Sequence, residues 1–206
     1  MMIIKVQEVS KRYNEHWVIK KLSHTFDSTH IYGIKGDNGS GKSTLIKMIS
    51  GFLSPTLGII TYVNDGREIS RDDIYKHVSI WGPHPSMSSV LTVKEMIAYY
   101  GKMKGWLQPM TPEEVFAFTK LPVSIHQRID ELSSGQAQRL GLTITLLSKT
   151  SIVLLDEPGS YLDKAAKSWM SDIIKARSTD RVLIIASNDE ADLSFASVAI
   201  NLSSKL

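Results

Sequence analysis

A glycine-rich loop near the start of the chain carries the clearest chemical signal in the sequence. It reads Gly36, Asp37, Asn38, Gly39, Ser40, Gly41, Lys42, Ser43, Thr44. Glycines allow positive φ and a close backbone approach, so successive N–H groups can converge on a polyphosphate. Lys42 is expected to neutralise phosphate charge, and Ser43 to offer its hydroxyl to Mg²⁺. The loop predicts a nucleotide site, and a flexible Gly/Ser turn is the alternative that the motif alone leaves open.

The segments on either side of this loop favour the nucleotide interpretation. Residues 31–34 have the apolar character of a short buried strand, and residues 45–49 place apolar side chains at helical spacing before Gly51 ends the helix. A helix that begins at the loop directs its positive end at bound phosphates. The predicted order of strand, loop and helix is the context that phosphate binding requires.

Composition and charge exclude several classes of protein. The chain has 206 residues, and its 24 basic and 21 acidic side chains are spread without a basic block, so we expect no nucleic-acid partner. No apolar run approaches the roughly 18 residues that a membrane span needs, and no signal peptide is recognisable, so we expect a soluble chain. The absence of cysteine excludes disulfides and thiolate metal sites, in agreement with a cytoplasmic enzyme.

The hydrophobic pattern changes character along the chain. Residues 3–9, 22–26 and 58–63 are short runs separated by turn residues and predict antiparallel strands. Residues 152–155 and 182–186 are continuous apolar runs, which are typical of parallel strands covered on both faces. The strands therefore predict a mixed α/β fold with both kinds of sheet.

A helical segment is expected between these two groups of strands. Thr92 with Glu95, and Thr111 with Glu114, are capping-box signatures of helix starts. We predict a single domain with a P-loop NTPase core of mainly parallel strands and an antiparallel β subdomain. Its core comprises residues 1–84 and 146–206, and its helical subdomain comprises about residues 85–145.

Two acids follow the first of the continuous apolar runs. Asp156 and Glu157 lie at the carboxyl end of the predicted strand, where open α/β sheets bind ligands. Asp156 is expected to hold Mg²⁺ through water, and Glu157 to orient or deprotonate an attacking water. A solvated acidic loop is the alternative, and the phosphate loop upstream argues against it.

A further motif identifies a family. It reads Leu132, Ser133, Ser134, Gly135, Gln136 and is followed by a helical pattern. Together with the phosphate loop and the Asp156, Glu157 pair, it resembles the signature of ATP-binding cassette (ABC) ATPases over nearly the whole chain. The resemblance implies ATP and Mg²⁺ as ligands and a head-to-tail dimer. In such a dimer Ser133, Gly135 and Gln136 close over ATP bound to the phosphate loop of the other subunit.

The resemblance also implies roles for two single residues. Tyr13 matches the aromatic residue that stacks on adenine, although a lone tyrosine could equally serve packing. Asp163 matches the loop residue that helps to join the two subunits, although an aspartate there could merely cap the next helix.

Two positions depart from the family pattern. Either Pro83 or His84 stands where the family has a glutamine that touches Mg²⁺ and the attacking water, and an imidazole nitrogen is a poorer Mg²⁺ ligand than a carbonyl oxygen. Asn188 stands in place of the switch histidine and never carries a positive charge. We therefore expect ATP binding to persist and hydrolysis to be slow.

The function expected from these features is that of an ATPase subunit that powers an ABC transporter. Membrane-spanning permease subunits would dock near residues 81–85 and the helical insertion, which places the chain in the cytoplasm at the inner face of the cell membrane. The second cassette subunit is either another copy or a different chain. A soluble ABC ATPase without a transport role and a nucleotide-gated binding module with little turnover are the alternatives.

Overall fold

The computed structural model describes residues 1–82 and 87–202. In this part of the chain the strands are β1 (Met2–Tyr13), β2 (His16–Asp27), β3 (Ile31–Lys35), β4 (Leu57–Asn64), β5 (Arg67–Ile69), β6 (Val78–Trp81), β7 (Ile152–Asp156), β8 (Val182–Ser187) and β9 (Val198–Asn201). The helices are α1 (Lys42–Ile49), α2 (Val93–Lys104), α3 (Pro112–Thr119), α4 (Ser134–Leu147), α5 (Lys164–Arg177) and α6 (Glu190–Leu193), with 3-10 turns η1 (Ile74–Lys76) and η2 (Ile129–Glu131). No helix within the described residues has the length and apolar character needed to cross a bilayer.

The strands form the two sheets that the sequence predicts. An antiparallel sheet has the order β2-β1-β4-β5, and a parallel sheet has the order β6-β7-β8-β3-β9. Every residue of β7 and β8 is buried, because helices cover both faces of a parallel sheet. The parallel order places the carboxyl ends of β7, β8 and β3 next to one another, and these three ends position the candidate site.

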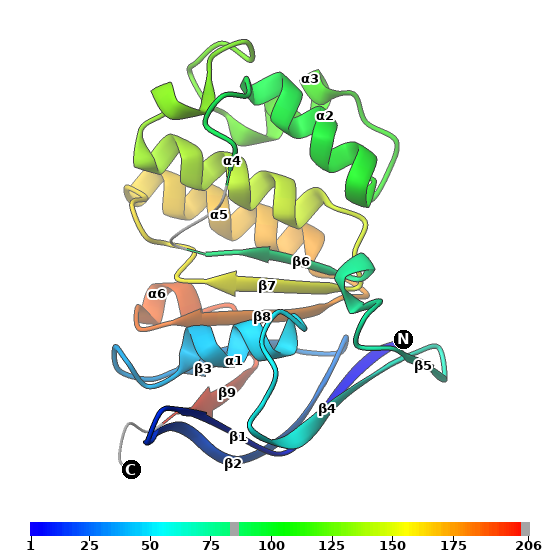
Figure 1. Cartoon of the computed structure of the whole chain (residues 1–206). Helices are drawn as coiled ribbons and strands as arrows, with labels where there is room; N and C mark the ends of the chain where they lie inside the picture. The colour runs from blue at the N-terminus through cyan, green and yellow to red at the C-terminus, as the bar shows by residue number, and fades with distance from the viewer. Residues whose placement is uncertain (83–86, 203–206) are drawn as a thin grey trace.

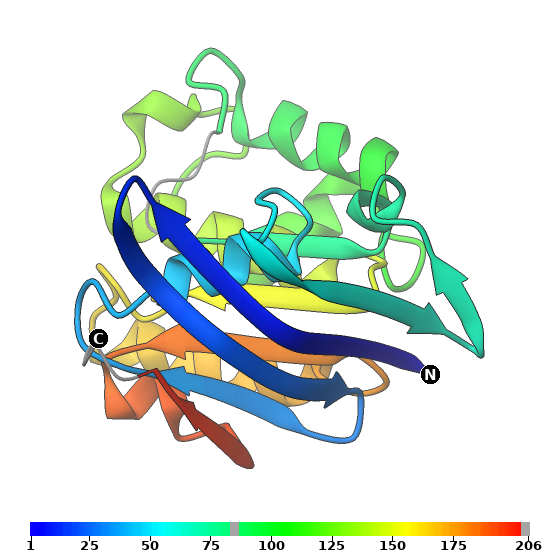
Figure 2. The same ribbon diagram turned by 60° about the horizontal axis from the view of Figure 1, so that its bottom comes forward.

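The layers of the molecule can be followed in Figure 1. Helices α4 and α5 cover one face of the parallel sheet, and α1 lies between its other face and the antiparallel sheet. One apolar core joins α1 to both sheets, with Leu45 and Ile49 of α1 fully buried against strand residues such as Ile4 and Ile184. Figure 2 brings the hairpin of β1 and β2, drawn in dark blue, to the front of the view. Because α1 is packed between the two sheets, the position of the loop that precedes it is fixed.

The chain between β6 and β7 is mainly helical, as predicted. Helices α2 and α3 begin with the predicted capping boxes, in which Thr92 and Thr111 each accept from the backbone of the glutamate three residues later. Ser133 caps α4 in the same manner, with Gln136 as its partner. These three helices share an apolar cluster of their own that includes Ile97 and Leu140. The division into a core and a helical subdomain at particular residues stays a prediction.

Candidate functional site

The phosphate loop joins β3 to α1 and needs its glycines for both conformation and space. Gly39 and Gly41 have φ values of 84° and 98°, in the left-handed region that favours glycine. A Cβ added at Gly41 would lie 2.8 Å from the side chain of Val18, and one added at Gly36 would lie 2.4 Å from the Ser40 hydroxyl. The predicted order of strand, loop and helix is confirmed, and the backbone runs close to its neighbours here.

Lys42 lies inside this loop. Its side chain is only 7% exposed, and its ammonium donates to the carbonyl oxygens of Gly36 at 2.7 Å and Asp37 at 3.2 Å. The same ammonium is 3.6 Å from the Glu157 carboxylate. The first N–H groups of α1 have no acceptor within the helix, so they add partial positive charge at the same place.

A pocket of about 360 Å³ opens over the start of α1. It is lined by Val18, Asn38, Gly39, Gly41, Lys42, Ser43, Thr44 and Glu157. The fold therefore brings the phosphate loop and the second acid of β7 to one cavity. An anionic ligand with several oxygens fits such a set of donors.

Asp156 ends β7 beneath this pocket. The residue is 6% exposed, and burial raises the pKa of its carboxyl, while a hydrogen bond from Ser43 and the nearby Lys42 act in the opposite direction. Its Oδ1 is buried and has no hydrogen-bond partner among the described residues. A buried, unpartnered carboxylate oxygen next to a hydroxyl is a donor set that fits Mg²⁺, which prefers oxygen ligands. No group of three or more His, Cys, Asp or Glu that could hold a metal occurs among the described residues, so any remaining ligands would be phosphate oxygens and water.

Glu157 is held between two strands and the phosphate loop. Its backbone has a left-handed φ of 49°, and its N–H donates to Ala186 O at 2.7 Å. Its carboxylate accepts from the Ser187 hydroxyl at 2.9 Å and faces Lys42. The side chain remains 21% exposed toward the pocket. A fixed carboxylate beside a phosphate site can accept a proton from water or orient that water.

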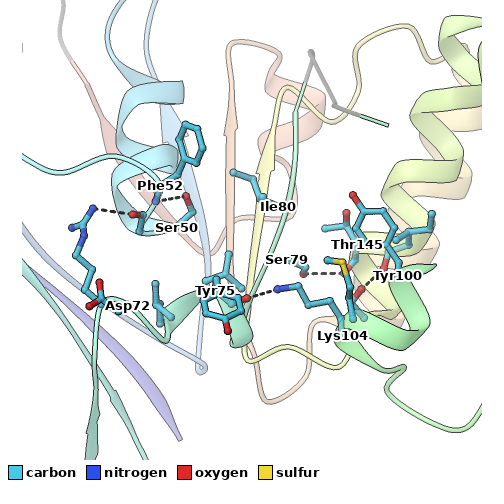
Figure 3. A pocket seen from close by; sticks show the side chains of 16 residues that line it. Ser50, Phe52, Asp72, Tyr75, Ser79, Ile80, Tyr100, Lys104 and Thr145 are labelled. Atoms are coloured by element: carbon cyan, nitrogen blue, oxygen red, sulfur yellow. Dashed lines mark hydrogen bonds between the residues drawn. The ribbon is translucent and has the colours of Figure 1, made fainter. Parts of the chain in front are cut away.

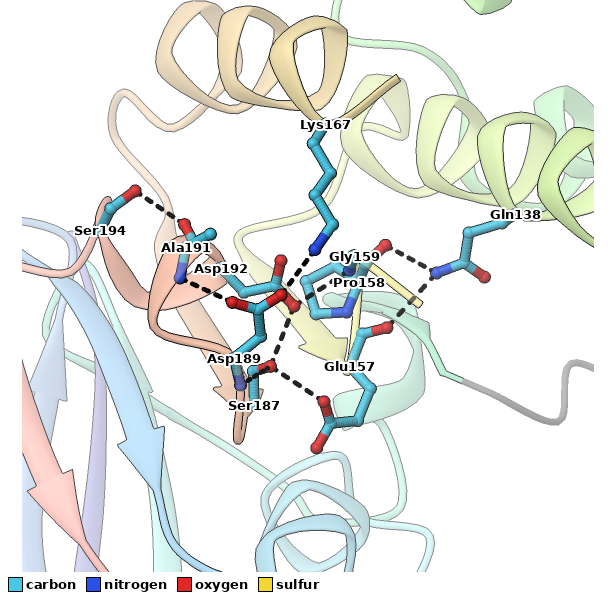
Figure 4. A network of polar contacts seen from close by, with 10 residues as sticks. All are labelled: Gln138, Glu157, Pro158, Gly159, Lys167, Ser187, Asp189, Ala191, Asp192 and Ser194. Atoms are coloured by element: carbon cyan, nitrogen blue, oxygen red, sulfur yellow. Dashed lines mark hydrogen bonds and ion pairs between the residues drawn. The ribbon is translucent and has the colours of Figure 1, made fainter. Parts of the chain in front are cut away.

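A polar network supports Glu157 from behind (Figure 4). The Ser187 hydroxyl also lies 2.9 Å from Oδ2 of Asp192, and the same oxygen accepts from Gly159 N at 3.1 Å. Asp192 is 1% exposed, and burial raises the pKa of its carboxyl. Asp189 caps α6 and forms an ion pair of 2.5 Å with Lys167.

Asn188 directly follows β8. It is exposed, and its Nδ2 donates to Asn38 Oδ1 at 3.2 Å. This contact joins Asn188 to the phosphate loop, and its role at the switch position stays a prediction. The predicted roles of Pro83 and His84 fall on residues outside the described part of the chain.

The signature turn lies apart from this pocket. Ser133 is exposed and accepts from Gln136 N at 3.3 Å, while Gln136 Oε1 accepts from Ser133 N at 2.9 Å. The hydroxyl proton of Ser133 is not used in this cap. Gly135 packs so closely that a Cβ there would lie 2.8 Å from Tyr161 O. None of these described residues lines the phosphate-loop pocket.

The two single-residue roles implied by the resemblance stay predictions. Tyr13 ends β1 with 46% exposure and with the Lys11 ammonium 5.3 Å from its ring centroid, and it is not among the described residues that line the pocket. Asp163 caps α5 by accepting from Ala166 N at 2.7 Å. The capping alternative for Asp163 is therefore realised, and a contact with a second subunit is untested.

Two residues of the site carry no motif in the sequence. Asp192 supports the turn after β7, and Gln138 of α4 donates to Pro158 O of the same turn at 2.8 Å. In the sequence each of them is only a polar residue within a helical pattern. Such a pattern predicts neither that the side chain is buried nor which residue it contacts.

A glycine loop between a strand and a helix, facing an acidic strand end, defines a P-loop nucleotide-binding protein. A model of the ABC transporter family matches residues 19–160. The chain belongs to this family, whose ATPase domains bind and hydrolyse ATP.

The curated relatives differ greatly in length. The chain is 30% identical over 192 residues to the glucosylceramide transporter ABCA12 of Mus musculus, covering 90% of this chain and 7% of the relative. It is 29% identical to the uncharacterised ABC transporter ATP-binding protein YxlF of Bacillus subtilis, covering 84% and 58%. It is 28% identical to the lantibiotic transport ATP-binding protein SrtF of Streptococcus pyogenes, covering 90% and 80%. The chain thus spans a small part of the first relative and rather more than half of the second.

Solved structures show the same fold. A putative ABC transporter ATP-binding protein from Pyrococcus furiosus superposes with a TM-score of 0.81 at 23% identity, and 97% of each chain is covered. The ATP-binding cassette MJ0796, solved as a dimer in a post-hydrolysis state bound to ADP and Pi, superposes with a TM-score of 0.79 at 19% identity, covering 98% of this chain and 97% of that one. These likenesses establish the fold of an ABC ATPase.

Proposed function

We propose that this chain is the ATP-binding and ATP-hydrolysing subunit that powers an ABC transporter by ATP-driven dimerisation. One observation carries the proposal: a single pocket is lined by the phosphate loop, Lys42 and Glu157. This pocket supplies positive charge for phosphates and a carboxylate for the attacking water. The proposal places the chain at the cytoplasmic face of a membrane through its partners.

Each residue of the pocket has a defined part in this function. Lys42 and the first N–H groups of α1 bind the phosphates, and Ser43 and Asp156 hold Mg²⁺. The ion shields phosphate charge when bound. Glu157 orients water and accepts its proton, with its carboxylate held by Ser187. Asn188 donates a hydrogen bond at the reacting end of the nucleotide but brings no positive charge, so hydrolysis is slow.

The signature turn completes the site of a second subunit. Ser133 keeps its hydroxyl proton available, and Gly135 and the start of α4 present backbone N–H groups. Because these groups are displaced from the pocket of their own chain, they serve a nucleotide held by the partner. MJ0796, a cassette of the same fold, is dimeric. The partner is either a second copy or a different cassette subunit.

A second cavity provides a docking surface for a membrane-spanning subunit (Figure 3). It measures about 510 Å³ and lies between the end of α1, η1, β6 and α2. Large apolar side chains at or beside its rim are exposed, namely Phe52 (84%), Tyr75 (60%), Tyr99 (53%), Met103 (51%) and Ile80 (44%). Contiguous exposed apolar side chains mark interaction surfaces. The cavity borders α2 of the helical insertion, which is one of the two regions where the sequence predicts a permease contact.

The test of the proposal combines three measurements on the full chain. Calorimetry with Mg-ATP should show binding that a Lys42→Met variant loses. Light scattering of the Glu157→Gln variant, alone and with candidate cassette partners, should show an ATP-dependent dimer. Affinity purification from solubilised membranes should recover a multi-span protein with the wild type and not with Phe52→Asp. Exposed Ile59 lies on β4 of the antiparallel sheet, outside the cavity, so Ile59→Asp is the matched control.

Recovery of no membrane protein would favour a soluble ABC ATPase without a transport role. Mg-ATP binding and dimerisation with no measurable turnover would favour a nucleotide-gated binding module, which Asn188 makes a specific second candidate. Failure to bind Mg-ATP would overturn the proposal altogether.

A further inference from the structure

Gln138 of α4 joins three separate segments through one buried amide. The residue is 3% exposed. Its Oε1 accepts from the indole N–H of Trp81 at 2.8 Å, and its Nε2 donates to Pro158 O at 2.8 Å and reaches Glu157 O at 3.5 Å. Figure 4 shows this amide directed at the turn that carries Glu157. Both ends of the Gln138 amide therefore have partners, Oε1 at the end of β6 and Nε2 at the turn after β7.

The turn that Gln138 contacts has a backbone that needs support. Glu157 is a non-glycine residue with a φ of 49°, a conformation that costs about 1 kcal/mol or more and persists only where the surroundings impose it. Ser160 N donates to Glu157 O at 3.1 Å from within the turn, and Asp192 holds Gly159 N at 3.1 Å from α6. Gln138 holds the turn from the opposite side, through the carbonyls of Glu157 and Pro158.

Trp81, which donates to Oε1 of Gln138, is itself fixed by close packing. Gly141 lies one turn after Gln138 on α4, and a Cβ added there would lie 2.0 Å from the ring of Trp81. The indole therefore lies against the helix at Gly141 while its N–H binds Gln138. Trp81 is the last residue of β6, so α4 is attached to the parallel sheet at both β6 and β7.

The position of Gln138 on α4 connects this attachment to the signature turn. Ser133 caps the same helix, and Gln136 completes that cap less than one turn before Gln138. A helix moves as a rigid element, so a displacement of its capped end is carried to Gln138.

We propose that Gln138 is a positioning residue that couples α4 to the backbone of Glu157, so that docking of the signature turn sets the place of the catalytic carboxylate in the same chain. This inference rests on the proposed function, in which the signature turn binds a partner's nucleotide. Gln138 itself touches no reacting group. It acts through the two carbonyls that fix the turn.

Two substitutions test the contacts of the amide. Gln138→Met keeps the length of the side chain and removes all three contacts, while Trp81→Phe removes the indole N–H together with part of the ring that packs against Gly141. Thr143→Val is the matched control, because Thr143 is equally buried on α4 and its hydroxyl binds only Arg139 O of the same helix. At saturating Mg-ATP, turnover should fall about 10-fold in Gln138→Met and about 3-fold in Trp81→Phe, with ATP affinity and the Thr143→Val rate unchanged.

Combination with Glu157→Gln distinguishes positioning from simple loss of stability. If Gln138 acts through Glu157, then adding Gln138→Met to Glu157→Gln should lower the residual rate no further. An additional 10-fold loss in the double variant would overturn the inference, as would a rise in the KM for ATP with an unchanged maximal rate.

Amide hydrogen exchange gives a readout that needs no turnover. In Gln138→Met, exchange at the N–H groups of Gly159 and Ser160 should accelerate about 10-fold, while Thr143→Val leaves it unchanged. Unchanged exchange in Gln138→Met would overturn the inference even if the chain binds Mg-ATP normally. Absence of Mg-ATP binding by the wild type would instead count against the proposed function, so the two failures are distinguishable.

Discussion

Two loops at the same end of the parallel sheet touch each other, and their central side chains are held very differently. The loop after β3 buries Lys42, whose ammonium has two carbonyl partners and a facing carboxylate. The loop after β8 exposes Asn188, whose amide N–H group donates to the equally exposed Asn38 at 3.2 Å. Among the described residues, the Lys42 side chain is therefore held by several contacts and the Asn188 side chain by one hydrogen bond.

This difference separates the binding of a nucleotide from its hydrolysis. Phosphate binding depends on backbone shape and on Lys42, both of which the core around α1 fixes. In the proposed function, hydrolysis depends on Glu157, whose carboxylate is held by Ser187, and on Asn188, whose side chain has one hydrogen bond among the described residues. Substitutions on the two sides should therefore have separable effects on affinity and on turnover.

The largest expected effect comes from the carboxylate. Glu157→Gln should lower turnover on the order of 1000-fold, because the general base is lost while the shape of the side chain is kept. Affinity for Mg-ATP should remain within about twofold of the wild type, since Lys42 and the loop are untouched. Steady-state phosphate release and calorimetric titration measure the two quantities. Glu190→Gln is the control, since Glu190 is exposed and its ion pair is with Lys35. An equal loss of turnover in Glu190→Gln would show that the effect is not specific to Glu157.

The second largest effect is expected at Lys42 of the phosphate loop. Lys42→Met removes the buried ammonium and should weaken Mg-ATP binding about 100-fold, since a charge-assisted contact of about 2 to 3 kcal/mol is lost. Lys47→Met, at the exposed end of the same helix, should leave affinity unchanged. Reduced turnover in a Lys42→Met variant that binds ATP as tightly as the wild type would contradict a role of Lys42 in binding.

The smallest effect concerns the network behind Glu157 and depends on pH. Burial raises the pKa of Asp192 above its ordinary value of 3.8, so the folded state holds this proton more tightly than the unfolded state. The resulting stabilisation is complete below 3.8 and is lost as pH rises through the folded-state pKa. At neutral pH the wild type therefore buries a charge with an unpartnered Oδ1, a cost that the neutral amide of Asp192→Asn avoids.

Urea unfolding should show this gain directly. Asp192→Asn should raise the free energy of unfolding by about 1 kcal/mol near pH 7 and by less near pH 4. Asp172→Asn, on the exposed face of α5, should change little at either pH. A loss of stability that is larger near pH 7 than near pH 4 would show that the folded state favours Asp192 as a carboxylate.

Those parts of the site that depend on local geometry could be predicted from the sequence. The strand before Gly36 and the helix after Gly41 follow from apolar spacing and from the φ preferences of glycine, and the helix starts at Thr92 and Thr111 follow from hydrogen bonds within a few residues. The two acids at the end of β7 were placed correctly because continuous apolar runs predict buried parallel strands.

The contacts that support Glu157 could not be predicted in the same way. Gln138 binds Trp81 from 57 positions away, and Asp192 binds Gly159 from 33 positions away. Such partners are set by the packing of helices on a sheet and leave no spacing in the sequence. The two roles considered for Asp163 differ in the same respect. Its helix cap is a local contact that the sequence could predict, whereas a contact with a second subunit depends on another chain.

We infer that this chain binds ATP fully and hydrolyses it slowly because Asn188 stands where the family has a histidine that can carry positive charge. Mg-ATP affinity and turnover, measured together for the wild type and Asn188→His, test this inference most directly. Equal affinity is expected, with a turnover about 10- to 100-fold higher in Asn188→His. Rapid wild-type turnover that is unaffected by Asn188→His, and abolished by Glu157→Gln, would contradict it.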